Sequence, residues 1–527
     1  MNITRYVPGE FAVLLFGISL MLFILPGCSD DNPGTRDDQD SDLLDSSDTG
    51  DDTDTSSDSI NDTELNPLPQ LPEPEYIIPG TRYYVDAVSG SDENPGTSEE
   101  PFLTLDFAVT KVKGGDGLIL RDGDYGNFSF GAEDAAPIAE VFDDWVTIKA
   151  DEGAAPSLGN VELGIWNKNG YLLEFSESGN SDLRLRFDGI TINNNFSVLG
   201  SRYVEIRNCL IKQEGAIEDL DPETDCLSLM NGQYITVLNS EITNCAVGAS
   251  LMTRDLVFSG NEIHHTIHDG IKLYGGENML IEGNAIHDLD DGLTDDDPDP
   301  TGRNRHVDGI HMHTIIHEGG YDNPRWAGGA TNVVVRSNFF YHIEAMDVMI
   351  NQNDWDGSWG DFVWENNIFA PSTGLMFIVG SSFERFVFRH NTVLFTPDDI
   401  WQSHFGRTMG EADMLTNPAS SAYYVQVWGN PASNEFYNNI MASASNGLTQ
   451  DEGIVDSNLF FTSGDDVPYK AINGSLSDYL NAGNLPGVLE AGSSVIDAGT
   501  DQYEIYETDI FGTPRDTTPD IGAVEYQ

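Results

Sequence analysis

The chain has 527 residues, a formal net charge of -64 at pH 7 and a sequence pI of about 4.1. This excess of carboxylates argues against a nucleic-acid partner, because phosphate binding requires clustered lysine and arginine side chains. Hydrophobic residues make up 39% of the sequence, and its 53 glycines and 10% aromatic residues favour many strands and turns over long helices.

Residues 1–27 are predicted to be a signal peptide. An apolar run from Phe11 to Leu25 lies at the extreme N-terminus and is too short to span a bilayer comfortably. The sequence Leu-Pro-Gly-Cys that follows resembles the lipobox of bacterial lipoproteins, whose cysteine becomes the lipidated N-terminus after cleavage. The resemblance implies lipidation of Cys28 and an exported bacterial lipoprotein, anchored in the outer membrane or at the cell surface. A plain secreted protein and a single short membrane helix are the alternatives.

Residues 28–79 are predicted to be the lipidated cysteine followed by a disordered acidic tether. Asp, Ser, Thr, Asn and Pro dominate this segment and apolar residues are few. Such a composition cannot bury a core, and its like charges keep the chain extended.

Residues 80–490 are predicted to fold as an all-β parallel β-helix, which is a solenoid of repeated coils. Short apolar segments recur about every 20–30 residues, the length of one such coil, whereas a β-propeller repeat needs about 40–50 residues. Aligning these segments produces one column of mostly asparagine residues at an inward bend, where amide side chains can hydrogen-bond from coil to coil. The column consists of Asp188, Cys209, Ser240, Asn261, Asn284, Asn338, Asn367, Asn391, Asn439 and Asn458. A pair of β-sandwiches is the other alternative.

Both ends of this region resemble known β-helix proteins. The segment from Thr81 to Tyr125 resembles the opening of many secreted right-handed parallel β-helix proteins, with a first strand at Tyr83–Asp86 and a short capping helix near Leu105–Val112. Residues 491–527 resemble the closing segment of bacterial surface β-helix proteins and are predicted to cap the far end.

The cysteines other than Cys28 are Cys209, Cys226 and Cys245, so at most one intramolecular disulfide forms among them. We expect buried free thiols in the stacked strands.

A second strand after the bend carries the candidate chemistry. The phrases Asp269-Gly-Ile-Lys272 and Asp308-Gly-Ile-His311 align on neighbouring coils, and the alignment adds Asp347 one coil further. Strand alternation points Lys272 and His311 outward, about 4.8 Å apart. The candidate catalytic residues are Lys272, His311, His268, Asp269, Asp308 and His313. For each residue alone, a solvated side chain or a turn-closing aspartate is the structural alternative.

An acidic loop from Asp288 to Arg305 is inserted between those two coils. Carboxylates crowded in one loop suit Ca²⁺, and a solvated loop is the alternative. The predicted Ca²⁺ ligands are Asp288, Asp290, Asp291 and Asp295. Basic and aromatic side chains near this loop are predicted to bind an anionic carbohydrate, the aromatic ones by stacking on sugar rings. These are Arg303, Arg305, Tyr274, Trp326, Trp355 and Trp359.

The fold pattern, the lipobox and the repeat together resemble the secreted β-helix polysaccharide-active enzymes, which include pectate lyases, alginate lyases and mannuronan C5-epimerases. The resemblance covers roughly Thr81 to the C-terminus and implies a lyase that cleaves a uronate-containing polysaccharide by β-elimination. In one lyase branch a lysine is the base beside a Ca²⁺ held by aspartates, which matches Lys272, Asp269 and the Asp288–Asp291 group. The motif of consecutive aspartates that follows the lysine strand in that branch is matched only loosely in this sequence. The Asp-Pro-His motif of the epimerases is absent.

Two other functions stay open. Asp269 and Asp308 would stand about 5 Å apart, which is the carboxylate separation of a retaining glycosidase. A glycan-binding or adhesive surface protein without turnover is the other alternative. For a lyase, the base is Lys272 or His311. The surrounding aspartates oppose the lowered pKa that a lysine base needs, which favours His311, or Lys272 kept close to bound Ca²⁺. We expect a monomer that binds polysaccharide.

Overall fold

The computed structural model describes residues 76–131, 142–164, 181–215, 220, 224–290, 307–312, 330–344, 346–350, 359–370, 374–378, 383–394, 425–428, 434–442, 454–461, 488–489 and 491–526. Contacts divide the chain into Met1–Asn61 and Asp62–Gln527, and all described residues belong to the second unit. The predicted signal peptide, Cys28 and nearly all of the tether lie outside the described residues. In the part that is described, no helix has the length and apolar character needed to cross a membrane.

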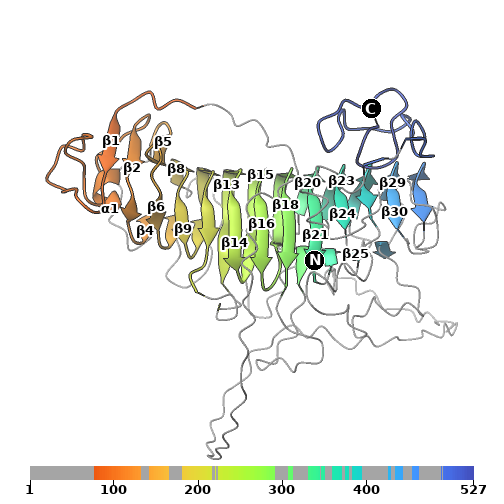
Figure 1. Cartoon of the computed structure of the whole chain (residues 1–527), viewed down its shortest axis with the longest axis horizontal. Helices are drawn as coiled ribbons and strands as arrows, with labels where there is room; N and C mark the ends of the chain where they lie inside the picture. Colours follow the sequence, from red (N-terminus) through yellow and green to blue (C-terminus); the bar gives the residue numbers. More distant parts are fainter. Residues whose placement is uncertain are drawn as a thin grey trace, which may run out of the picture. The chain divides into compact units, whose positions relative to one another are not determined.

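The described strands of Asp62–Gln527 stack in parallel, each paired with its equivalent one coil away (Figure 1). They form a 20-stranded and a 12-stranded sheet, which confirms the predicted parallel β-helix. The 20-stranded sheet contains β1 (Arg82–Val85), β2 (Gly117–Leu120), β4 (Phe128–Phe130), β5 (Val146–Ala150), β7 (Val161–Gly164), β8 (Ser181–Asp188), β10 (Phe196–Leu199), β11 (Ser201–Arg207), β13 (Asp225–Leu238), β15 (Val247–Ser259), β17 (Ile271–Glu282), β19 (Asp308–Met312), β20 (Ala330–Arg336), β22 (Met346–Ile350), β23 (Trp359–Glu365), β25 (Gly374–Ile378), β26 (Phe383–Arg389), β28 (Val425–Trp428), β29 (Asn434–Tyr437) and β31 (Ile454–Asp456). The 12-stranded sheet contains β3 (Gly123–Asp124), β6 (Pro156–Leu158), β9 (Thr191–Asn193), β12 (Leu210–Lys212), β14 (Glu241–Cys245), β16 (Glu262–Thr266), β18 (Ala285–Leu289), β21 (Phe339–Ile343), β24 (Ile368–Ala370), β27 (Thr392–Val393), β30 (Ile440–Ala442) and β32 (Leu459–Phe461).

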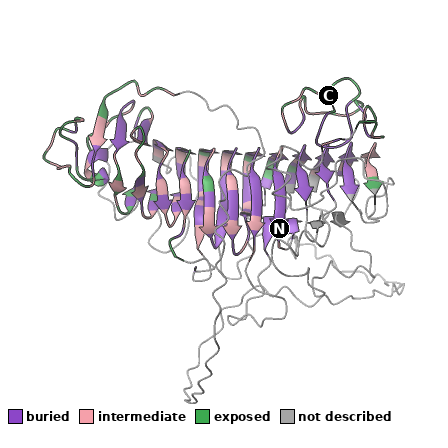
Figure 2. Cartoon of the chain, viewed as in Figure 1, coloured by how far each residue is buried: buried purple, intermediate pink, exposed green. Residues whose placement is uncertain are grey.

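The 20-stranded sheet covers two faces of each coil. Long strands such as β15 and β17 run along both faces, whereas other coils divide the same path into two strands, as β19 and β20 do. Most described residues of the central strands are buried or half-buried (Figure 2). Alternate side chains fill the interior, among them Ile271, Leu273, Ile310 and Met312, all predicted to point inward and all buried. The apolar period of two therefore fixes which residues of these strands face outward.

The asparagine column forms a hydrogen-bonded ladder along the bend. Asn284 N donates to Asn338 Oδ1 at 2.9 Å, and Asn338 N donates to Asn367 Oδ1 at 3.0 Å. Each side-chain amide also donates to a carbonyl of the preceding coil, as Asn338 Nδ2 does to Ile281 O at 3.0 Å. The same pattern runs from Ser240 to Asn458, so this part of the predicted column is confirmed.

A left-handed residue precedes each ladder position. These residues are Gly189, Asn208, Asn239, Gly260, Gly283, Ser337, Asn366, His390, Asn438 and Ser457. Glycine and asparagine tolerate positive φ best, which explains why the sequence so often places one of them there.

Two positions of the sequence alignment are wrong. Arg207 pairs with Asp188, so Ile190 and not Asp188 occupies the ladder position opposite Cys209. Asp308 pairs with Met346, so Asp347 lies one residue beyond the position that the alignment gave it. Strand pairing is continuous at both places, so neither error comes from a bulge there. The apolar residues around each position fit more than one offset in the sequence.

The glycines of the two Asp-Gly-Ile phrases are required by close packing between coils. A Cβ atom on Gly270 would approach Gly309 O to 2.9 Å, and one on Gly309 would approach Asp347 O to 2.5 Å. The repeated glycine is thus a structural feature of the stack.

The segments at the ends of the folded region pack on the coils. Helix α1 (Leu105–Val109) lies within the predicted helical segment, begins at the N-cap Thr104 and buries Leu105, Ala108 and Val109. At the other end, Val495, Ile521 and Val524 join a cluster on the outer face of the 12-stranded sheet, and Figure 1 shows this segment beside several coils. The predicted capping roles of both segments stay predictions.

Cys226 and Cys245 form a disulfide, with Cα atoms 5.7 Å apart, while Cys209 is free and buried. The expectation of free thiols is therefore wrong for the pair and confirmed for Cys209. The two cysteines are 19 residues apart in sequence. The turn of one coil brings them into contact.

We expect Asn338→Ala to lower the free energy of unfolding by about 2–5 kcal/mol, because it leaves buried partners such as Asn284 N and Ile281 O without hydrogen bonds. Denaturant unfolding measures this. The control Thr331→Ala, an exposed position of the same coil, should change it by less than about 0.5 kcal/mol. Equal losses of unfolding free energy in both variants would show that the ladder makes no specific contribution to stability.

Reduction of the Cys226–Cys245 disulfide should lower the unfolding free energy by about 3 kcal/mol, the value for a loop of this size. Thermal unfolding with and without reductant measures the loss. The double variant Cys226→Ser/Cys245→Ser should start at the reduced value and should not respond to reductant.

Candidate active site

Lys272 of β17 and His311 of β19 lie side by side on neighbouring coils, as the sequence predicts. The strand register pairs them directly, and their flanking residues Ile271, Leu273 and Ile310 point inward. The Lys272 side chain is 15% exposed and the His311 side chain 8%. Of the two, Lys272 is therefore the more accessible from outside.

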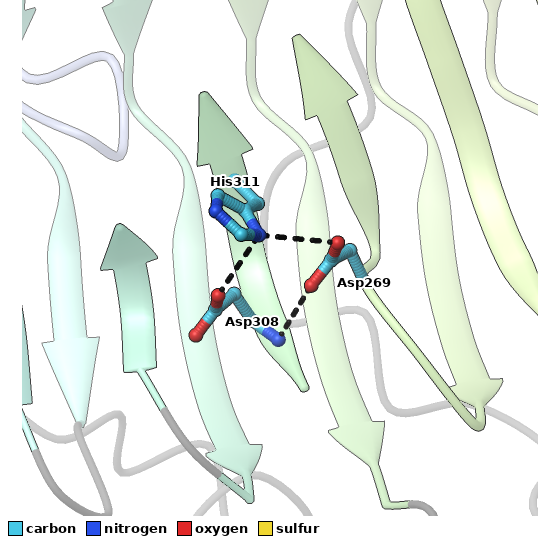
Figure 3. A group of neighbouring side chains, drawn as sticks. All are labelled: Asp269, Asp308 and His311. Atoms are coloured by element: carbon cyan, nitrogen blue, oxygen red, sulfur yellow. Dashed lines mark hydrogen bonds and ion pairs between the residues drawn. The ribbon is translucent and has the colours of Figure 1, made fainter. Parts of the chain in front are cut away.

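The Asp269 carboxylate connects the basic side chains of this group. Its Oδ2 lies 3.1 Å from His268 Nδ1 and 3.8 Å from Lys272 Nζ. It also lies 3.4 Å from His311 Nδ1 (Figure 3). Its Oδ1 accepts a hydrogen bond from Asp308 N at 3.0 Å. One buried carboxylate thus draws together residues of two coils.

Asp308 repeats this arrangement one coil further. Its Oδ1 accepts from Met346 N at 3.1 Å, and its Oδ2 lies 3.3 Å from His311 Nδ1. Figure 3 shows the His311 ring between the two carboxylates. Both aspartates are fully buried, and both use one oxygen to fix the backbone of the next coil.

Burial and neighbouring charges shift the pKa values of Asp269 and Asp347 in opposite directions. Burial acts to raise the pKa of Asp269, but the charges and hydrogen bonds of His268 and His311 outweigh it and hold that pKa well below its usual range. Burial, and then the charge of Asp308, raise the pKa of Asp347 well above its usual range. Asp269 is therefore a carboxylate and Asp347 a neutral carboxylic acid at neutral pH.

Tyr274 lies on the same face as Lys272, two residues further along β17. It is the extra residue of a bulge, because Leu251 pairs with Leu273 whereas Met252 pairs with Gly275. Burial, and then the charges of Asp225 and Asp269, raise the pKa of the Tyr274 phenol above its usual range. The phenol therefore keeps its proton across the physiological range.

Two of the predicted Ca²⁺ ligands, Asp288 and Asp290, lie among the described residues. Asp288 belongs to β18 of the 12-stranded sheet, where its carboxylate oxygens lie 2.7 Å from His287 Nδ1 and 2.8 Å from His342 Nδ1. Asp290 is half-buried, and its backbone N–H donates to Thr266 O. Asp288 is thus already paired with two imidazoles.

The other predicted site residues lie outside the described residues. They are His313, Arg303, Arg305, Trp326, Trp355, Asp291 and Asp295, together with the side chain of Trp359.

A second titratable group lies on the outer face of the 12-stranded sheet and was not predicted. The rings of His264, His287 and Tyr341, which pair in register on three coils, stack with centroids 5.2 Å and 4.5 Å apart. The sequence could have indicated this stack, because each ring residue lies three positions after the ladder asparagine of its coil.

Comparisons with known proteins concern the fold. A protein-family model described as a right handed beta helix region matches residues 164–294. No curated protein matches the chain.

Several solved structures are similar at low sequence identity. The pectate lyase Pel9A is 16% identical with a TM-score of 0.43, and the match covers 85% of this chain and 97% of that one. The GH136 lacto-N-biosidase from Eubacterium ramulus is 11% identical with a TM-score of 0.39, covering 72% and 68% of the two chains. The surface adhesin PfbA of Streptococcus pneumoniae is 10% identical with a TM-score of 0.39, covering 70% and 91%. Identities this low assign no function.

The protein should lose stability at alkaline pH through His287. Burial acts to lower the pKa of His287, but the charges and hydrogen bonds of Asp288 and Glu262 raise it to about 9. An unfolded histidine has a pKa near 6.5, so this stabilisation, on the order of 3 kcal/mol, is complete below about pH 6.5 and is lost as the pH rises through about 9.

Denaturant unfolding at about pH 6 and about pH 10 tests this contribution. Asp288→Asn should destabilise the protein at the lower pH and much less at the higher one. Asp255→Asn, which removes a carboxylate bonded to amides and not to imidazoles, should cause a loss that does not depend on pH in this way. A pH-independent loss in Asp288→Asn would contradict the assignment.

Proposed function

We propose that the protein is a polysaccharide-active β-helix enzyme that cleaves a uronate-containing polysaccharide by β-elimination. The observation that carries the proposal is the Lys272–Asp269–His311 group, in which an accessible amine and a buried imidazole share one carboxylate across two coils. β-Elimination requires a base for the C5 proton, positive charge near the substrate carboxylate and a proton donor for the leaving oxygen.

Lys272 is the proposed base. Its side chain is more exposed than that of His311, and its Nζ lies 3.8 Å from Asp269 Oδ2. As the base it acts as the neutral amine, a form that a neighbouring positive charge favours. His268, whose side chain is 23% exposed, and His311 supply positive charge beside it when protonated. Tyr274, a phenol that keeps its proton, is the proposed donor to the leaving oxygen.

The glycosidase reading is less well supported by the same geometry. Asp269 and Asp308 are fully buried, and each accepts a backbone N–H of the next coil. A nucleophilic carboxylate must reach the sugar ring, so these contacts favour a positioning role for both residues.

A panel of uronate polysaccharides, incubated with the full chain, tests the reaction type. Ultraviolet absorbance from unsaturated ends, with reducing ends in equal number, supports the lyase. New reducing ends without absorbance would contradict the lyase and indicate a hydrolase. Binding without either signal would indicate a glycan-binding protein. The predicted Ca²⁺ site in the acidic loop stays a proposal, tested by adding chelator and then restoring Ca²⁺.

Lys272→Gln should lower the elimination rate by at least about 100-fold, the usual contribution of a general base. Product absorbance against time measures it. The matched control Lys212→Gln, on the 12-stranded sheet, should keep the wild-type rate. Full activity in both Lys272→Gln and His311→Gln would show that the reaction takes place elsewhere.

A further inference from the structure

We propose that Asp269, Asp308 and His311 bind one first-row divalent transition-metal ion of the Zn²⁺ type. The side-chain donor atoms of these three residues lie within 4.8 Å of one another, and all three residues are buried. Imidazole and carboxylate together suit Zn²⁺, whereas Ca²⁺ requires six to eight oxygen ligands.

The backbone of the β-helix orients both carboxylates for this role. Asp269 Oδ1 accepts from Asp308 N, and Asp308 Oδ1 accepts from Met346 N. These hydrogen bonds turn the Oδ2 atoms of both residues toward the same nitrogen, His311 Nδ1. Ligands held by a second set of hydrogen bonds before the metal arrives are typical of metal sites.

The two donor spacings that involve His311 fit a tetrahedral ion. His311 Nδ1 lies 3.4 Å from Asp269 Oδ2 and 3.3 Å from Asp308 Oδ2. For Zn–N and Zn–O bonds of about 2.0–2.2 Å, the edges of a tetrahedron measure about 3.3–3.6 Å. Three protein ligands leave the fourth position for water or substrate, as in catalytic zinc sites.

A separate observation also indicates a cation here. Asp347, one coil beyond Asp308, is fully buried, and neither oxygen of its side chain has a hydrogen-bond partner among the described residues. The strand register pairs Asp308 with Met346 and Ile310 with Val348, so Asp347 lies opposite Gly309, the residue after Asp308. A buried polar group without partners calls for an unseen ligand, and a cation or its bound water beside Asp308 would supply a partner.

The consequence for catalysis rests on the proposed function. A metal bound to Asp269 Oδ2 would lie close to Lys272 Nζ, which is 3.8 Å from that oxygen. Its open position would take the carboxylate of a uronate and neutralise the charge that develops after proton removal. The competing explanation is a protonated His311 that bridges the two aspartates without any metal.

Metal binding is measured on the full chain after treatment with chelator. Zn²⁺ and Ca²⁺ are added by equilibrium dialysis, and Co²⁺ is followed by its visible absorption. We expect about one Zn²⁺ per chain that excess Ca²⁺ does not displace. His311→Gln and Asp308→Asn should weaken Zn²⁺ binding by more than about 100-fold, beyond the roughly 10–100-fold lost with an outer partner.

The matched control is His265→Gln, which removes an imidazole from the 12-stranded sheet and should leave Zn²⁺ affinity unchanged. X-ray absorption of the Zn²⁺-loaded wild-type chain, which should show one imidazole among oxygen ligands, gives an answer even if His311→Gln fails to fold. Unchanged binding in His311→Gln, loss of binding in His265→Gln, or an all-oxygen ligand set would overturn the site.

The two proposals fail separately. Zn²⁺ binding at His311 without elimination activity would contradict the proposed lyase and support the metal site. Elimination activity in a chain that binds no Zn²⁺ would contradict the metal site and support the lyase.

Discussion

Hydrogen bonding between successive coils, concentrated in the asparagine ladder, is the interaction on which the rest of the structure depends. Each ladder asparagine from Asn261 to Asn458 accepts the backbone N–H of the coil before it and donates back to a carbonyl of that coil, as Asn284 does. The bend would otherwise bury backbone groups without partners, at a cost of about 1–3 kcal/mol each. Because the ladder repeats at one position, it also holds the register of every strand that follows the bend.

That fixed register creates the candidate site. Asp269 and Asp308 are 39 residues apart in sequence, but the stacking of coils places Asp308 N within 3.0 Å of Asp269 Oδ1. The two aspartates use the same device as the asparagines, a side-chain oxygen that accepts the N–H of a neighbouring coil. Their second oxygen is then directed at His311. The hydrogen bonding that stacks the coils thereby also places the two carboxylates beside one imidazole.

The surroundings of these residues give two chemically identical carboxyl groups, Asp269 and Asp347, different pKa values. Asp269 is stabilised as a carboxylate by the histidines beside it, whereas Asp347, without such partners, is held neutral by burial. The net charge of the whole chain has little part in this, because exposed charges more than about 8 Å away are screened at physiological salt. Local contacts within two or three coils decide the electrostatics.

The sequence by itself determined the parallel β-helix, most of the ladder and the pairing of Lys272 with His311. A repeat with an asparagine at one bend and a strict inward alternation specifies these features locally, coil by coil. Only the tertiary structure decided the alignment at Ile190 and Asp347, since the apolar residues around each position fit more than one offset in the sequence. Only it joined Cys226 to Cys245, paired Asp288 with His287 and His342, and brought His311 between two carboxylates. These contacts depend on distances between coils and on side-chain directions, which the order of residues does not contain.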